Sequence, residues 1–361
     1  MQTPEPSVPE PAPAGQKSAL LNNGTVTLDK GTFSRSAEAS TAANQSGGNS
    51  YYVLTNHGTM TINDGVTVKF SDNNFGFYSS AIENGWYTPS QNTSGKDSVL
   101  TINGGVVTGG KITIKNDDYG VLTINGGVVA TQPNSNYYAL FSWNEAEINA
   151  GTINGAIGAQ GDGKDNYENG YIKVSGEAVI NGNVQALPSS NVQITGGTVT
   201  GAVGTYSGAD SSCLQVTGGT FSDTSAQNYI PEDMQLVLLD GSYVLADENV
   251  EVADDGTIDA VASIGDVYYS DLKTALVKAT DGQTVKLLKD ITITSSNTSK
   301  DSAELTITTD ITLDGNNHTI TASEDTWAIN THIIGVVNGA KAAINDLTIV
   351  GHAGTKHGIN V

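Results

Sequence analysis

The sequence has a single cysteine, Cys213, among its 361 residues. One thiol cannot form a disulfide within the chain, and it cannot make a thiolate metal cluster. Cations are also scarce, because Arg35 is the only arginine and no lysine or arginine lies between Lys173 and Lys273. With 16 basic and 38 acidic residues the net charge is −22, which makes nucleic acid and anionic membranes poor partners.

Long apolar runs are missing as well. No stretch approaches the length of a membrane span, and the start, MQTPEPSVPEPAPAG, has no basic region followed by an apolar one. We expect a mature chain in which residues 1–18 form a Pro-rich, acidic, disordered linker. Such spacers are typical of modular surface proteins, although an ordinary disordered tail has the same composition. Secreted proteins without disulfides are common on Gram-positive cell surfaces.

Glycine, in contrast, is abundant at 42 residues, and Thr, Asn and Ser separate the apolar residues, as in a turn-rich all-β protein. The phrase LTINGGVV occurs at 100–107 and again at 122–129, and further copies keep its order of apolar, turn and glycine residues. The paired apolar residues are Val26 and Leu28, Met60 and Ile62, Leu100 and Ile102, Leu122 and Ile124, Ala146 and Ile148, Ile172 and Val174, Val192 and Ile194, and Leu214 and Val216.

A further apolar residue follows the turn in most copies and is expected to point inward. These residues are Phe33, Val107, Val129, Ile153, Val179, Val199 and Phe221, while Thr67 breaks the rule and suggests a bulge that turns Val66 or Val68 inward. Short strands returning every twenty-odd residues predict a right-handed parallel β-helix of about eight coils over residues 19–228. A flat antiparallel meander is the alternative, but it does not require the same side-chain type at the same phase of every repeat.

The repeat stops after residue 228. Residues 229–262, with their Asp-Gly turns, predict a β-hairpin cap followed by an acidic connector. Residues 269–282 predict a short amphipathic helix with Ser270 as N-cap and Gly282 after its end. Its apolar stripe is Leu272, Ala275, Leu276 and Ala279. Strand patterns then resume, so residues 263–361 are expected to be the start of a second β-helix with an N-terminal capping helix.

Two segments resemble a known family. GGTFSDTSAQNYIPEDMQLVLLDGSYVL resembles the closing segment of large pectate-lyase-like surface proteins of gut Gram-positive bacteria, and SIGDVYYSDLKTALVKATDGQTVKLLKDITI followed by ITLDGNNHTI resembles the opening of their β-helix module. The resemblance covers nearly all of residues 19–361. It implies an adhesin-like protein, secreted or attached to the cell wall, that forms part of a larger modular protein and contacts host or microbial surfaces.

Catalytic chemistry is weakly indicated. Lyases of the β-helix class use basic residues against acidic sugars, and this acidic chain would repel polygalacturonate. Glycoside hydrolases need carboxylates from neighbouring coils, and the spacing of Asp72, Glu83 and Asp97 does not align them. We therefore predict no catalytic residues, although a polysaccharide lyase or hydrolase stays the alternative. No cofactor and no metal site are expected; Asp162, Asp165 and Glu168 of the loop GDGKDNYENG could hold Ca²⁺, but a solvated turn fits them better.

Aromatic residues are the stronger signal. Tyr51 in NSYYVL and Tyr137 in NSNYYALFSW each begin a Tyr-Tyr pair and lie eleven residues before an aligned isoleucine, Ile62 and Ile148, and the insertion at 66–104 adds further rings. Such rings form either a platform for sugar or protein, or packing beneath the insertion. The candidate ligand-binding residues are Phe75, Tyr78, Trp86, Tyr87, Tyr137, Tyr138 and Trp143. The sequence therefore predicts a non-catalytic, extracellular, adhesin-like rod that binds a host or microbial glycan or protein, with an enzyme or a structural spacer as alternatives.

Overall fold

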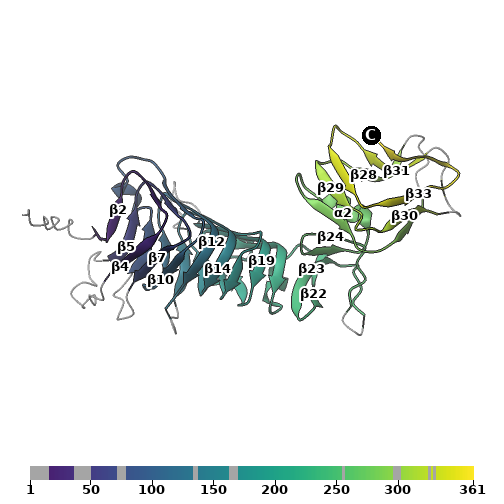
Figure 1. Ribbon diagram of the computed structural model, residues 1–361. Helices are drawn as coiled ribbons and strands as arrows, with labels where there is room; N and C mark the ends of the chain where they lie inside the picture. Colours follow the sequence, from purple (N-terminus) through teal and green to yellow (C-terminus); the bar gives the residue numbers. More distant parts are fainter. Residues whose placement is uncertain are drawn as a thin grey trace, which may run out of the picture. The chain divides into compact units, whose positions relative to one another are not determined.

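The computed structural model describes residues 16–35, 50–70, 79–132, 137–161, 170–253, 257–295, 302–323, 327 and 331–361 (Figure 1). The chain divides into two compact units, Met1–Val216 and Thr217–Val361. Each unit is built mainly of parallel strands, so the all-β class and the long parallel sheets of a β-helix-like solenoid are confirmed. No helix among the described residues is long and apolar enough to span a membrane.

One row of parallel strands in the first unit is named here the first sheet. Its strands are β1 (Gln16–Lys17), β2 (Leu20–Asn22), β5 (Ser50–Asn56), β8 (Ser80–Asn84), β11 (Ile114–Asn116), β13 (Tyr138–Ser142), β15 (Ala156–Ala159), β18 (Val184–Ala186) and β20 (Val203–Thr205). Strand β8 falls inside the insertion at 66–104, so part of that insertion continues the sheet.

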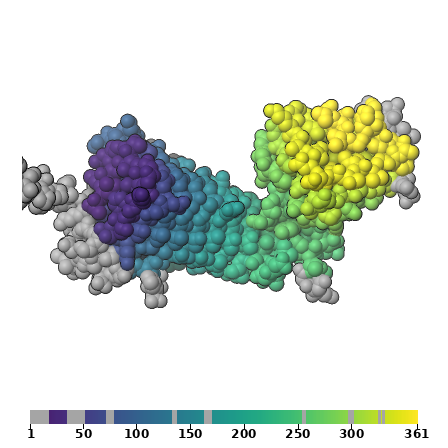
Figure 2. Space-filling view, viewed as in Figure 1, coloured from purple at the N-terminus to yellow at the C-terminus, as the bar shows by residue number. Residues whose placement is uncertain are grey.

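The other strands of this unit form two further rows. One contains β3 (Thr25–Leu28), β6 (Thr59–Ile62), β9 (Ser98–Ile102), β12 (Gly120–Ala130), β14 (Glu145–Asn154), β16 (Gly170–Val174), β19 (Ser190–Val199) and β21 (Leu214–Phe221). The other contains β4 (Gly31–Arg35), β7 (Val66–Phe70), β10 (Val106–Thr108) and β17 (Val179–Asn181), together with the second halves of β12, β14 and β19. Within the first unit, the repeats lie next to one another in the order of the sequence, as the gradual change of colour from purple to teal shows (Figure 2).

The apolar pairs of the repeat form in-register ladders between the parallel strands. Leu28 pairs with Ile62 and Ile62 with Ile102, and the ladder continues through Ile124 and Ile148. Ile62, Ile124 and Ile148 are fully buried. Removing each such side chain from water stabilises the fold by about 1.5–3 kcal/mol. The inward orientation predicted for these pairs is thus confirmed where the repeat is regular.

Two repeats have one extra residue at the corner. The prediction for Val179 was wrong, because Ile180 pairs with Ile153 in the buried ladder while Val179 is only half-buried. Similarly, Val68 takes the position at which the template places Thr67, as a bulge predicts. In both repeats the corner is one residue longer than in LTINGGVV, and a sequence template of fixed length therefore picks the wrong inward residue.

The corner glycine of LTINGGVV is required by both backbone angle and space. Gly127 has φ = 81°. A Cβ atom there would lie 2.7 Å from the carbonyl oxygen of Gly105, its counterpart in the preceding copy. A larger residue would therefore separate the stacked corners.

An asparagine ladder runs inside the first sheet, and the sequence analysis did not find it. Asn22 donates to Asn56 at 2.7 Å, Asn56 to Asn84 at 2.7 Å, and Asn84 to Asn116 at 2.8 Å, all buried. Asn56, Asn84 and Asn116 each follow a buried aliphatic residue by two positions along the strand, and Asn22 follows the half-buried Leu20 in the same way. The same side-chain amide thus serves as donor and acceptor at each level, which satisfies polar groups that water cannot reach.

The second unit begins with antiparallel strands. Strands β22 (Met234–Leu239) and β23 (Ser242–Asp247) form a hairpin whose turn, Asp240 and Gly241, has positive φ at both residues. A second antiparallel pair, β24 (Ala262–Ile264) and β25 (Val267–Tyr269), precedes helix α2 (Leu272–Lys278).

Three parallel rows follow α2. They are β26 (Thr284–Leu287), β29 (Ile311–Asp314) and β32 (Ala342–Asn345); β27 (Ile291–Ile293), β30 (Thr319–Ala322) and β33 (Thr348–Val350); and β28 (Ala303–Ile307), β31 (Thr331–Val336) and β34 (Thr355–Asn360).

Helix α2 is present at the predicted position, but its N-cap is Asp271 and the prediction of Ser270 was wrong. The Asp271 carboxylate accepts hydrogen bonds from the backbone nitrogen of Thr274 at 2.8 Å and from its hydroxyl at 2.6 Å. A carboxylate at this place also interacts favourably with the positive end of the helix dipole. Ser270 instead donates its backbone N–H to Asp247.

Candidate functional site

The outer face of the first sheet carries a row of matched side chains. Thr55 pairs in register with Glu83, Glu83 with Lys115, and Lys115 with Phe141. Because side chains alternate along a strand, these residues lie opposite the buried aliphatic and asparagine ladders. The row continues from Phe141 through Gly158, Gln185 and Gly204.

A buried charge cluster, defined here as Glu83, Lys115 and Asp117, lies on this row. Lys115 Nζ is 2.9 Å from Asp117 Oδ2 and 3.5 Å from the hydroxyl of Tyr52. Glu83, Lys115 and Asp117 are only 1%, 2% and 5% exposed. Ionisable groups at this depth cost free energy to bury, so such a cluster is a candidate functional centre in its own right.

The cluster keeps one of its carboxyl groups protonated. Burial, followed by the negative charge of Asp117, raises the pKa of Glu83 to about 8, while Lys115 and the hydroxyls of Tyr52 and Thr55 act in the opposite direction. Burial by itself lowers the pKa of Lys115, but Asp117, Tyr52 and Glu83 outweigh it and the pKa lies above its usual value. At neutral pH the cluster therefore pairs the lysine cation with Asp117 and holds an uncharged Glu83, whose Oε2 has no hydrogen-bond partner among the residues that the structure describes.

Aromatic rings cover the lysine. Lys115 Nζ lies 5.6 Å from the ring centres of both Tyr87 and Trp143, and 5.7 Å from that of Tyr52. Tyr87 is nevertheless 64% exposed. Each cation–π contact of this kind is worth about 0.5–2 kcal/mol, so the buried cation holds these rings in place from below.

The rings continue along the sheet from Trp143. Its ring centre lies 4.4 Å from that of Phe141, and Phe141 lies 4.7 Å from Tyr138 in an edge-on arrangement. Tyr138 donates its hydroxyl to Gln185 Oε1 at 2.6 Å. Gly158 lies directly under this ring, because a Cβ atom there would be 2.7 Å from Tyr138 Cε1. We call Tyr87, Trp143 and Tyr138, together with the buried Phe141 on which Tyr138 and Trp143 pack, the aromatic face.

Two more tyrosines are placed near this surface or beside it. Tyr206 is 58% exposed. The pKa of the half-buried Tyr138 is raised mainly by its burial and, to a smaller extent, by the charge of Tyr206. Tyr137 is 44% exposed, and Lys111 Nζ lies 4.4 Å above its ring centre. Tyr137 therefore has a cation of its own over its ring.

Trp86 packs on a histidine. The rings of Trp86 and His57 are stacked with centres 3.7 Å apart and an interplanar angle of 10°. Burial lowers the pKa of His57 to about 4, against a weaker upward effect of a backbone hydrogen bond with Gly85. Trp86 thus contributes to packing at the corner between strands.

The structure places Tyr87 and Trp143 over Lys115 and joins Trp143 to Tyr138 through Phe141, while Tyr137 has Lys111 over its ring and Trp86 stacks on His57. Phe75, Tyr78 and the three acidic residues considered for Ca²⁺ (Asp162, Asp165 and Glu168) lie outside the described residues, as does Asp72. Within the described ranges no group of three or more His, Cys, Asp or Glu side chains could hold a metal ion. The sequence analysis missed Lys115, Asp117, Phe141, Gln185 and Tyr206.

Comparison with known proteins finds no matching family model, no similar curated protein and no similar solved structure. The resemblance to pectate-lyase-like surface proteins therefore stays a prediction. The function has to be argued from the side chains themselves.

Proposed function

We propose that this chain is a non-catalytic, adhesin-like protein whose first unit binds a glycan on its aromatic face. The supporting observation is the set of rings held from below by a buried cation and a glycine. Rings fixed before binding lose little conformational entropy when a ligand arrives. The exposed parts of Tyr87, Trp143 and Tyr138 offer apolar area to the C–H groups of a sugar ring, with the amide of Gln185 nearby as a polar partner.

The proposal includes the finer architecture. The first unit is taken as a right-handed parallel β-helix of about eight coils, and the second unit as the start of another, introduced by its hairpins and helix α2. A solenoid of this kind is rigid along its axis and displays loops and side chains at a regular spacing of about 4.8 Å. Such a support suits a surface protein that must present one face to a ligand.

We place this protein outside the cell, at the cell surface or in the wall, as part of a larger modular protein. The acidic composition and the single cysteine support that setting, as does the resemblance stated above. The proposed partner is a host or microbial surface glycan. If the chain bound a protein but no glycan, the same rings would instead be a protein-binding site.

The test is binding of the purified chain to a panel of host, plant and microbial glycans. Tyr87→Ala and Trp143→Ala are expected to weaken binding at least tenfold, because aromatic residues dominate such contacts. The matched control is Tyr171→Ala, which removes a half-buried tyrosine from strand β16, outside the first sheet. Glycan binding that survives both aromatic-face variants would refute this assignment, and absence of binding to any glycan or protein would favour a structural spacer.

A polysaccharide-active enzyme is the second candidate, and one observation favours it. Glu83 is a buried carboxyl group with a pKa of about 8, as expected for a general acid at neutral pH. Incubation with the same panel distinguishes the two: new reducing or unsaturated ends that disappear in Glu83→Gln would establish an enzyme. Binding without any new ends supports the adhesin-like function.

A further inference from the structure

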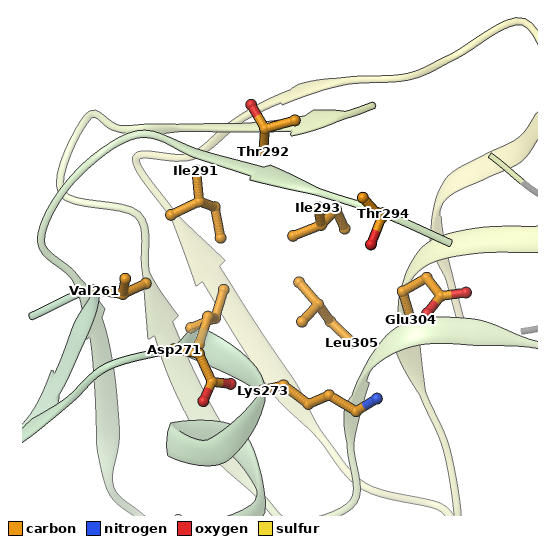
Figure 3. Close-up of a pocket in the computed structure, with 10 residues that line it drawn as sticks. Val261, Asp271, Lys273, Ile291, Thr292, Ile293, Thr294, Glu304 and Leu305 are labelled. Carbon is orange, nitrogen blue, oxygen red and sulfur yellow. The ribbon is translucent and has the colours of Figure 1, made fainter. Parts of the chain in front are cut away.

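The second unit contains a pocket of about 380 Å³ between helix α2 and strands β27 and β28 (Figure 3). Leu272 and Leu305 line it and are almost fully buried, while Val261 closes one side. Ile291 and Ile293 of β27 are half-buried and point into it. Apolar and polar residues contribute about equally to the lining, and a pocket of this volume with convergent polar groups is typical of a ligand site.

The pocket lies beside an unpaired strand edge. Strands β26, β27 and β28 are the first members of their parallel rows. Strand β24 pairs with the outer edge of β26, and α2 packs on β28. Strand β27 pairs with β30, and no other strand of the described chain pairs with it. Its outer backbone N–H and C=O groups are thus available to an additional strand.

Three charged residues line the rim, the carboxylates of Asp271 and Glu304 and the amine of Lys273. Both carboxylate oxygens of Asp271 accept hydrogen bonds from Thr274, and Glu304 accepts one from Ser295 at 2.7 Å. Lys273 is exposed, and no hydrogen bond or ion pair of its amine occurs in the described part of the chain. The Lys273 amine is therefore open to an acidic group of a ligand, while the two carboxylates already accept hydrogen bonds from Thr274 and Ser295.

We propose that this pocket binds an extended peptide that adds to β27 as a parallel strand. The peptide places a branched aliphatic side chain over Leu272 and Leu305, and an acidic group of the peptide pairs with Lys273. Main-chain hydrogen bonds of strand addition supply affinity, and the pocket supplies selectivity for the side chain. This site is in the other unit of the chain and does not depend on the glycan proposal.

The chain itself supplies a suitable probe. Residues 317–325, NHTITASED, contain strand β30, which already pairs in parallel with β27, followed by two acidic residues. A fluorescein-labelled peptide of this sequence is titrated against the full chain and followed by anisotropy. Hydrogen–deuterium exchange on the same mixture is expected to show added protection at residues 290–295.

Two substitutions in the pocket test the contacts. Lys273→Glu is expected to weaken peptide binding about tenfold, because it replaces an exposed ion pair by a repulsion. Ile293→Thr keeps a β-branched residue but removes apolar area, and about a fourfold loss is expected. Lys286→Glu is the matched control, since Lys286 is an exposed lysine of β26 that does not line the pocket.

Three results would overturn the assignment: no anisotropy change, equal affinity of all variants, or protection that appears away from 290–295. A fourth result would also overturn it: hexanoate displaces the peptide, and bound hexanoate gives β27 no protection from exchange. The ligand of the pocket would then be a small amphiphile and not a peptide strand. Because glycan binding is measured separately with the aromatic-face variants, failure of one proposal leaves the other standing.

Discussion

Glu83 and Lys115 occupy matched register positions on the adjacent parallel strands β8 and β11. The pairing places a carboxyl group and an amine side by side, away from water, with Asp117 as the close partner of the amine. Glu83 stays protonated at neutral pH because its burial, and after it the nearby negative charge of Asp117, raises its pKa to about 8. The stability of the first unit and the order of its aromatic face therefore depend on the same three side chains.

Lys115→Met is expected to lower the free energy of unfolding by about 3–5 kcal/mol, because it leaves Asp117 buried without its cation. Urea unfolding followed by tryptophan fluorescence measures the change. The control is Lys278→Met, whose ion pair with Asp233 has 45% and 51% exposed side chains, and which is expected to cost less than about 1 kcal/mol. Equal effects of the two substitutions would mean that the buried pair has no special role. Adding Asp117→Asn to Lys115→Met should restore part of the loss.

Glu83→Gln is expected to change the pH dependence of stability. The pKa of Glu83 is raised in the folded state from 4.5 to about 8, so the folded chain keeps a proton that the unfolded chain has released. The contribution of Glu83 is complete below about pH 4.5 and is lost as the pH rises to about 8. Glutamine does not titrate, so the free energy of unfolding of the variant should rise relative to that of the wild type across this interval. The change should be on the order of several kcal/mol.

The measurement is urea unfolding of both proteins at several pH values on either side of this interval. Taking the difference between the variant and the wild type cancels all other titrating groups. The difference should be constant below the interval, grow within it and become constant again above it. A difference that is independent of pH throughout would show that Glu83 is ionised in the folded protein.

Asn84→Ala is expected to destabilise the first unit by about 1–3 kcal/mol, because it removes the partner of two buried amides, those of Asn56 and Asn116. The chain offers a matched control in Asn103, which takes part in a similar ladder on the exposed side. Asn103→Ala should cost less than about 0.5 kcal/mol, because water replaces the lost partners. Thermal unfolding of both variants gives the comparison, and an equal loss would contradict the importance of burial.

The predictability of this fold follows from where the repeat is regular. Ile102, Ile124 and Ile148 could be placed in one ladder from the sequence because their spacing to the turn glycine is constant. Strand β11, Ile114–Asn116, could not, because it has only three residues and the chain between the first sheet and the repeat varies in length. Without that register, nothing in the sequence places Lys115 beside Glu83, 32 residues earlier.

The candidate site was partly predictable for the same reason. Aromatic residues are rare in this sequence, so the Tyr-Tyr pairs and the tryptophans stand out, and Tyr87, Tyr138 and Trp143 could be named from the sequence. Which of the predicted aromatics form one surface depends on contacts across strands, and no local pattern reports that Trp86 turns to His57. The cap of α2 shows the limit at a smaller scale, because Ser270 and Asp271 are both good N-caps and only the geometry of Asp271 and Thr274 distinguishes them.

Gly158→Ala should disturb the aromatic face without breaking the backbone. The added Cβ would lie 2.7 Å from Tyr138 Cε1 and 3.2 Å from Phe141 Cε2, so the tyrosine ring has to move and its bond to Gln185 is lost. We expect a destabilisation of about 1–3 kcal/mol from this overpacking, together with clearly weaker glycan binding. Gly24→Ala is the matched control, since no atom lies within 4 Å of a Cβ there. Binding is measured at a temperature where both variants are folded. If Gly158→Ala bound glycans as tightly as the control, the position of Tyr138 would be irrelevant to recognition, and the ligand would have to lie over Tyr87 and Trp143 alone.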